Sequence, residues 1–203
     1  MTSPTPKFNP LSNTDVDTLG NQIELATSGG SSLEHQSAPF FSRKLGFAVG
    51  RDNPVPGLTT AATFGLSHED WTDVGFKDRT ELVTTWKGDE PTFTNVLVSV
   101  ARACVINRIP PFAGVVFGDA FAASNVPNFG KRMPHGLGLF PYMWKDARFG
   151  PVQLSAHRVW FVQVVPIFEG ERTFLAEHGI DAFETILAGE GARFYLSSRD
   201  SHC

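Results

Sequence analysis

The sequence is short of cysteine and of long apolar runs, and each shortage excludes a class of protein. Two cysteines, Cys104 and Cys203, in 203 residues cannot build a disulfide framework, and no CxxC pair occurs. We therefore expect a reducing compartment, the cytoplasm. No apolar stretch is long enough to span a bilayer, and the opening MTSPTPKFNP lacks the basic and apolar regions of a signal peptide. No membrane association is expected.

The sequence also lacks an excess of positive charge. Lys and Arg number 17 against 21 Asp and Glu, giving a formal net charge of −4, and the basic residues are scattered. Nucleic acid is therefore not expected as a partner, because phosphate binding needs a concentrated positive surface. Tyrosine is scarce too, at two residues against 18 phenylalanines, which indicates aromatic residues used for core packing.

Sequence motifs of the common catalytic and cofactor sites are missing. The chain has no GxSxG, P-loop or HExxH motif, and none of its six histidines lies two or four residues from another. We expect no cofactor and no metal. Asp119 is the single carboxylate in an apolar segment, between VVFG and AFAA. It is either a turn residue that bonds its own backbone or a polar anchor in a groove.

Two amphipathic helices are predicted before residue 110. In 90–107, apolar residues recur at i, i+3, i+4 and i+7, with Asp89 as N-cap and Pro91 in the first turn. A shorter helix is predicted for 14–26, after a disordered start.

Alternating or apolar runs bounded by turn residues predict the strands. RTELVTTWK (79–87) alternates in a way that is typical of a half-buried strand, and 158–168 is apolar enough to be central and antiparallel to 152–157. Pro166 is expected just after the point where this strand ends, because proline cannot donate to a ladder. The other predicted strands are 44–50, 59–67, 113–117, 135–144 and an edge strand at 192–197.

An acidic segment that is predicted to be helical follows the last long strand. Glu169 and Glu171 favour a helix start, and Gly179 favours its end, with a second helix from Asp181. These elements predict an α+β fold, a mixed, largely antiparallel β-sheet flanked by two or three main helices. The expected organisation is a partly disordered segment with a short helix (1–35), one domain (36–197) and a frayed tail (198–203).

Several segments resemble, in order and spacing, motifs of the Suppressor of fused domain. The resemblance spans roughly residues 58–188. Its motifs are TFGLS (63–67), RTELVTTW (79–86), the helix from Pro91 through Ala101-Arg102, Gly118-Asp119, Arg132 to His135 with the following LGLF, and the closing VWFVQVVPIFEGE and HGIDAFETIL.

The resemblance implies a protein-binding role without catalysis. In animals the domain is the first half of a Hedgehog-pathway regulator that clamps a peptide of Gli-type transcription factors as an added β-strand. Single-domain bacterial members, which this chain resembles, have been proposed as immunity proteins that neutralise a cognate toxin. The family's Gly-Asp aspartate implies Asp119 as a partner-binding residue, and we place Arg132 and His135 on the same surface. Ala103 stands where the family has a helix aromatic, which favours a partner other than a Gli-type peptide.

Two alternatives remain at this stage. One is an enzyme, or a protein that binds a small molecule or metal, with a pocket around Asp119, His135 and His157. The other is a chaperone-like adaptor that binds many proteins.

Overall fold

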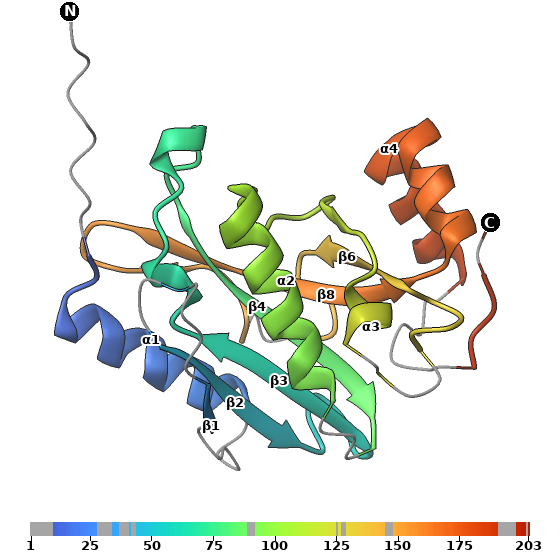
Figure 1. Cartoon of the computed structure of the whole chain (residues 1–203). Helices are drawn as coiled ribbons and strands as arrows, with labels where there is room; N and C mark the ends of the chain where they lie inside the picture. The colour runs from blue at the N-terminus through green and yellow to red at the C-terminus, as the bar shows by residue number, and fades with distance from the viewer. Residues whose placement is uncertain are drawn as a thin grey trace, which may run out of the picture.

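The computed structural model shows an α+β arrangement in which one β-sheet is covered by helices (Figure 1). It describes residues 10–27, 34–36, 41, 44–88, 92–124, 126, 129–144, 148–190, 198–201 and 203. The helices are α1 (Asn13–Ala26), α2 (Phe93–Asn107), α3 (Ala120–Ala123) and α4 (Glu169–Glu190), with short 3-10 turns at Leu66–His68 and Thr72–Val74. The strands are β1 (Glu34–Gln36), β2 (Leu45–Arg51), β3 (Leu58–Phe64), β4 (Arg79–Lys87), β5 (Val116–Phe117), β6 (His135–Leu139), β7 (Val152–Gln153) and β8 (Arg158–Ile167).

The eight strands of the described residues form one mixed sheet. Their order is β1-β2-β3-β4-β8-β6-β5, with β7 paired to β8 beside this path. β4 and β8 run parallel, with Arg79 opposite Val159, and all the other pairs are antiparallel. This confirms the predicted α+β fold with a largely antiparallel mixed sheet, including the antiparallel pairing of 152–153 with β8.

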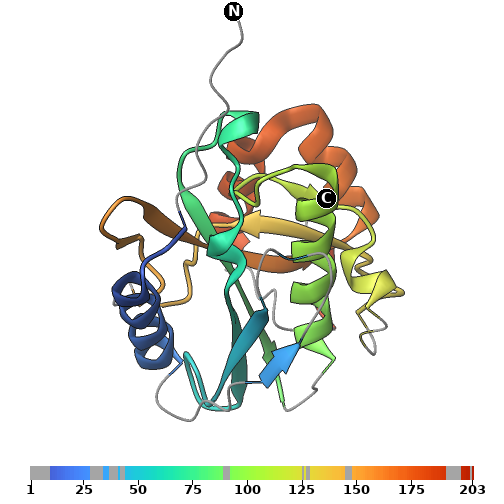
Figure 2. The same cartoon turned by 60° about the vertical axis from the view of Figure 1, so that its left-hand side comes forward.

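Both faces of the sheet centre are covered, so the half-buried character predicted for 79–87 is wrong. Eight of the nine β4 residues are buried. Leu82 and Val162 pack into the cluster that contains the α2 side chains, whereas Val83 and Phe161 pack into the cluster that contains α1. Because successive strand residues point to opposite faces, a central strand between two helix layers needs apolar or satisfied side chains on both. Figure 2 shows α1 and α2 on opposite sides of the strands.

Helix α2 matches its prediction closely. The expected apolar face is buried, and its fully covered members are Phe93, Val96, Leu97, Val100, Ala101 and Cys104. The N-cap is Thr92, which makes no side-chain capping bond; Asp89 and Pro91 lie outside the described residues.

Pro166 lies inside β8 and not after it, which corrects the prediction. It is opposite Gly136 in the β6–β8 ladder, whereas the β4–β8 ladder ends at Gln163. The carbonyl of Pro166 accepts a hydrogen bond of 2.8 Å from Arg199 instead. A proline fits here because β4 no longer requires an N–H from this position.

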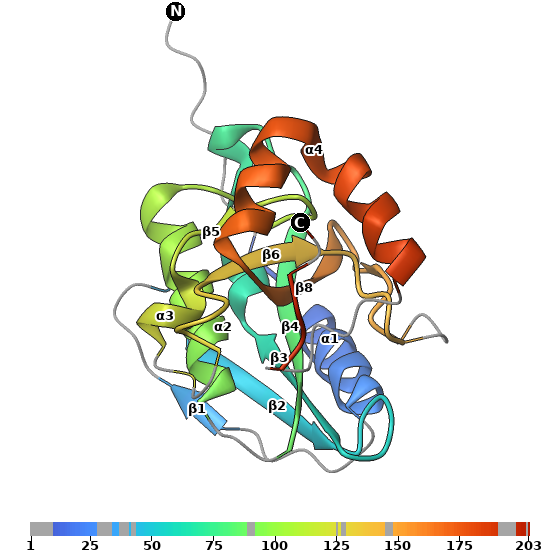
Figure 3. The same cartoon turned by 90° about the vertical axis from the view of Figure 1, so that its right-hand side faces the viewer.

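Helix α4 begins at Glu169, as predicted, and covers one face of β6 and β8 (Figure 3). Leu175 and Phe183 pack against strand residues on that face. Gly179 interrupts the helix with φ 80°, a left-handed conformation that favours glycine, so the predicted break at this residue is confirmed.

Some strands are shorter than predicted. β6 ends at Leu139, not at residue 144, and the short helix α3 follows Asp119. The GxG of β6 has a packing reason: a Cβ at Gly138 would lie 2.5 Å from the carbonyl oxygen of Phe112. The segment 192–197 lies outside the described residues.

Glu81, on β4, holds the turn after β3 with a buried carboxylate. The residue is 0% exposed, and burial raises the pKa of its carboxyl, although its hydrogen bonds oppose the shift. Its donors are Thr63 Oγ1 at 2.5 Å and the backbone N–H groups of Gly65 at 2.8 Å, Ser67 at 3.0 Å and Leu66 at 3.3 Å.

Asp15 fastens α1 to the turn between β7 and β8. Its carboxylate caps the helix in a capping box with Ser12. It also accepts hydrogen bonds from the backbone N–H of Ser155 at 2.8 Å and from the Ser155 hydroxyl at 2.7 Å. The backbone and side-chain bonds from Ser155, followed by that from Ser12, hold the pKa of Asp15 well below its usual range.

Candidate functional site

His135 is the buried centre of a small polar cluster at the start of β6. The residue is 5% exposed, and the backbone N–H of Asp119 donates to its Nδ1 over 3.0 Å. Because Nδ1 accepts, the neutral ring carries its proton on Nε2, which lies 2.5 Å from the Glu169 carboxylate. The histidine therefore bridges the turn before α3 and the first residue of α4.

Asp119 presents its carboxylate outward from this cluster. Its side chain is 75% exposed, with Oδ1 3.5 Å from His135 Nδ1. The backbone is left-handed, at φ 54°, and is fastened by its N–H to His135 and by its carbonyl, which accepts from Ala123 N at 2.8 Å. A non-glycine residue in this region costs on the order of 1 kcal/mol, so neighbouring contacts must hold it. The hydrogen bonds that hold this conformation come from the backbone of Asp119, and most of its carboxylate is exposed.

Glu169 adds a second exposed carboxylate beside Asp119. Its side chain is 58% exposed and accepts two bonds from Arg172, of 2.9 and 2.6 Å. The bond from Arg172, followed by that from His135, lowers the pKa of Glu169, so it is ionised at neutral pH. Sequence reasoning explained Glu169 by its place at the helix start and missed its contact with His135, 34 residues away.

Arg132 lies next to this cluster and packs against the C-terminal tail. Its Nη2 donates to the carbonyl of Arg199 over 3.2 Å and lies 4.0 Å from Asp200, while its guanidinium stands 5.7 Å from the centre of the Phe168 ring. Phe168 directly precedes Glu169, so Arg132 lies near the cluster of Asp119, His135 and Glu169.

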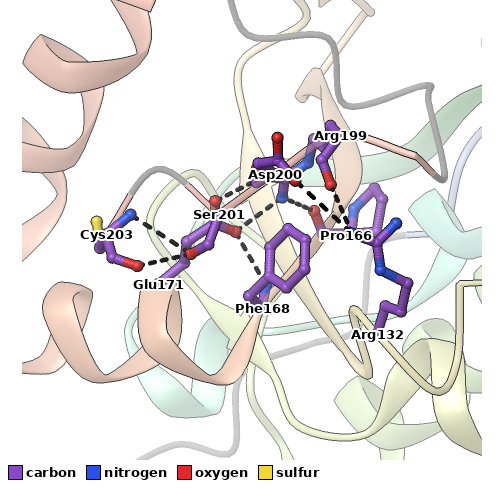
Figure 4. Close-up of polar contacts among 8 residues, drawn as sticks. All are labelled: Arg132, Pro166, Phe168, Glu171, Arg199, Asp200, Ser201 and Cys203. Atoms are coloured by element: carbon purple, nitrogen blue, oxygen red, sulfur yellow. Dashed lines mark hydrogen bonds and ion pairs between the residues drawn. The ribbon is translucent and has the colours of Figure 1, made fainter.

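Arg199 anchors the tail in a buried ion pair (Figure 4). Its guanidinium donates to both carboxylate oxygens of Glu171, at 2.6 and 2.7 Å, and stacks on the ring of Phe168, with 4.7 Å to the ring centre. Glu171 is 0% exposed and Arg199 is 8% exposed. The tail 198–203 was expected to fray, but Arg199 within it is buried and bonded to Glu171. No local pattern in the sequence pairs these two residues.

His157 does not join His135 and Asp119, which corrects the alternative pocket. It precedes β8, whereas His135 is opposite Ile167 at the other end of that strand. Ten extended residues span about 30 Å. His157 therefore lies at the opposite end of β8 from Asp119 and His135, and the three side chains do not share one cavity.

The described residues hold no group of three or more His, Cys, Asp or Glu side chains that could bind a metal ion. Burial also raises the pKa of the Cys104 thiol to about 12, which keeps it protonated and unreactive. Among the helices described, none is long and apolar enough to cross a membrane.

The fold and this surface define an α+β domain in which exposed charged side chains contact a buried histidine at the edge of the core. The chain belongs to the Suppressor of fused family, because the family model described as Suppressor of fused protein (SUFU) matches residues 42–199. It is also similar to the immunity protein YqcF of Bacillus subtilis (strain 168), with 24% identity over 152 residues, 74% of this chain and 77% of that protein.

Solved structures share the fold. A Suppressor of fused homologue from Neisseria gonorrhoeae FA 1090 has a TM-score of 0.70 at 15% identity, covering 95% of this chain and 98% of that one. A chain of the Sufu–Fu complex has a TM-score of 0.65 at 15% identity, covering 97% and 93%. For Drosophila Suppressor of Fused the TM-score is 0.58 at 14% identity, and the match covers 98% of this chain but 54% of that protein.

Proposed function

We propose that this protein is a bacterial immunity protein that acts in the cytoplasm by binding and neutralising a cognate toxin, without catalysis. Membership of the Suppressor of fused family and the similarity to an immunity protein support this role. The contact surface of the proposal contains Asp119, Arg132 and Glu169, and the buried His135 beneath it contacts Asp119 and Glu169.

The observation that carries the proposal is the contrast between a buried histidine and the two exposed carboxylates it positions. His135 is buried, whereas the side chains of Asp119 and Glu169 are 75% and 58% exposed. Glu169 is already paired with Arg172, so Asp119 is the carboxylate that favours a partner bringing a complementary positive group. The backbone of Asp119 is left-handed and therefore strained at this surface.

A co-expression assay tests the proposal. The probe is the toxin encoded beside this gene, expressed in bacterial cells with and without the protein. We expect the protein to restore growth and to bind the purified toxin. Failure to rescue cells from any toxin encoded alongside it contradicts neutralisation.

Two matched variants test the surface. Asp119→Asn removes the charge but keeps the side-chain size and tolerates the left-handed backbone, so we expect the fold to be kept and the toxin affinity to fall about tenfold. Asp17→Asn, at an exposed position on α1, is the control and should bind like the wild type. Equal affinity of both variants would exclude Asp119 from the interface.

A further inference from the structure

A pocket that holds a guanidinium group lies where β8 ends and α4 begins, and we name it the arginine pocket. It consists of the carbonyl of Pro166, the ring of Phe168 and the carboxylate of Glu171, and Figure 4 shows these three residues together with Arg199. The carboxylate accepts two bonds from the guanidinium, of 2.6 and 2.7 Å, the carbonyl accepts a third of 2.8 Å, and the ring centre lies 4.7 Å away. All three parts come from the segment 166–171, so the pocket belongs to the packed domain and its occupant comes from the tail.

The arginine pocket matches a guanidinium better than an ammonium group. A planar guanidinium presents its N–H groups as a fork to both oxygens of a carboxylate, and its face stacks on an aromatic ring. The ammonium of lysine is a compact point charge and has neither the fork nor the flat face. Glu171 is also held in position, because its Oε2 accepts the backbone N–H of Phe168 over 2.9 Å. The pocket therefore selects arginine over lysine.

One side chain provides the main attachment of the tail to this pocket. Among the tail residues that the structure describes, 198–201 and 203, Arg199 alone is buried. The side chain of Asp200, directly after it, is fully exposed. A bond of 3.2 Å from Arg132 to the carbonyl of Arg199 adds a contact to the tail backbone. Because the residues on either side are exposed, replacing the guanidinium in the pocket is enough to release most of the buried part of the tail.

Exchange of the occupant costs less free energy than emptying the pocket. An empty pocket leaves the carboxylate of Glu171, which is 0% exposed, without this counter-charge, and a buried charge that has lost its partner is strongly unfavourable. An arginine from another polypeptide restores the same bonds, so the bonds lost and gained are alike. The exposed carboxylate of Asp119, which His135 and Glu169 connect to the same end of α4, attracts a basic segment to this place.

We propose that the arginine pocket is a binding site for an arginine side chain of another polypeptide, which takes the place of Arg199 and releases the tail. The occupant is an arginine within a basic segment, because the pocket selects a guanidinium and the neighbouring surface presents Asp119. The inference requires a polypeptide partner but not a toxin, so it does not rest on toxin neutralisation.

Chemical rescue tests the selectivity of the pocket. Arg199→Ala in the full-length chain removes the occupant, and the probe is N-ethylguanidinium at about 10 mM, with ethylammonium as the matched cation. We expect N-ethylguanidinium to raise the Tm of this variant by about 3 °C more than ethylammonium does, because a ligand that binds the folded state stabilises it. The control is Arg172→Ala, which removes an exposed guanidinium and should respond equally to both cations. An equal response of Arg199→Ala to both cations would overturn the proposal.

Release of the tail from the wild-type chain tests the exchange itself and does not require any variant to fold. A nitroxide spin label is attached to the exposed Cys203, whereas Cys104 is buried with a thiol pKa of about 12 and stays unlabelled. The probes are the synthetic peptide SSRDS, copied from residues 197–201, and the same peptide with lysine in place of arginine. Both are titrated to about 50 mM, well above the effective concentration of a tethered tail, which is on the order of millimolar.

We expect the arginine peptide to raise the mobile fraction of the label at least about threefold more than the lysine peptide, because the lysine peptide cannot form the bidentate pair. Equal release by both peptides would assign the effect to screening by salt, and release by neither would make Arg199 a fixed structural anchor. Either result would overturn the proposal, whatever the outcome of the toxin assay.

Discussion

Replacing Arg199 by methionine removes the positive half of the buried ion pair with Glu171. Methionine keeps an apolar side chain of similar length but takes away both charge-assisted bonds to Glu171, of 2.6 and 2.7 Å, and the guanidinium that stacks on Phe168. The Glu171 carboxylate stays 0% exposed, so it loses this counter-charge where water cannot replace it. Removing one partner of a buried pair costs about 3–5 kcal/mol of the free energy of unfolding.

For a chain of this size, such a loss lowers the Tm by about 6–20 °C. The assay is urea denaturation, with the midpoint and the slope m measured for each variant. The matched control is Arg172→Met, which removes a guanidinium from an exposed pair with Glu169, where the side chains are 49% and 58% exposed. Exposed pairs contribute about 0–1 kcal/mol, so this control should be close to the wild type.

A loss below about 1 kcal/mol for Arg199→Met would refute the reasoning about the tail, since removing one partner of a buried pair leaves the other charge buried and uncompensated.

Two further predictions concern the other buried carboxylates. Glu81→Gln turns an amide NH₂ toward groups that all donate, which should lower the free energy of unfolding by about 2–4 kcal/mol in chemical denaturation; a change under about 1 kcal/mol would contradict the bonding pattern. The lowered pKa of Asp15 means that its contribution to stability is full above the unfolded-state pKa, about 4, and is lost as the pH falls below it. The stability difference between wild type and Asp15→Asn should therefore be constant from about pH 5 to 7 and shrink below about pH 4, and a difference that does not vary with pH would argue against the Ser155 contact.

Local patterns determined the elements of this protein. The spacing of Phe93, Val96 and Val100 sufficed for α2, because a helix buries one face at intervals set by its own geometry. Gly179 marked the break in α4 in the same way, since the conformation it requires is a property of its own backbone. Strand ends were less accurate: nothing local showed that β6 ends at Leu139 or that Pro166 lies inside β8.

The tertiary structure decided which side chains act together. Asp119 and His135 were expected on one surface, but the bond between them arises only when the turn before α3 lies next to β6, and Glu169 joins them only when β6 lies next to α4. The sheet likewise separated His157 from this group, because they lie at opposite ends of β8. Contacts of this kind join residues that no periodic pattern links.

The exposed Phe140 and the buried Arg199 show the same difference between what the sequence determines and what the packing determines. The sequence alone determined that Phe140 and Trp160 are large and apolar, and that Arg199 and Glu171 are charged. Their exposure, or their burial in a pair, depends on which strands and helices pack around them. Pairing across the fold is a property of the packed chain, since its free energy depends on distance and on exclusion of water, and neither is written in a local stretch of residues.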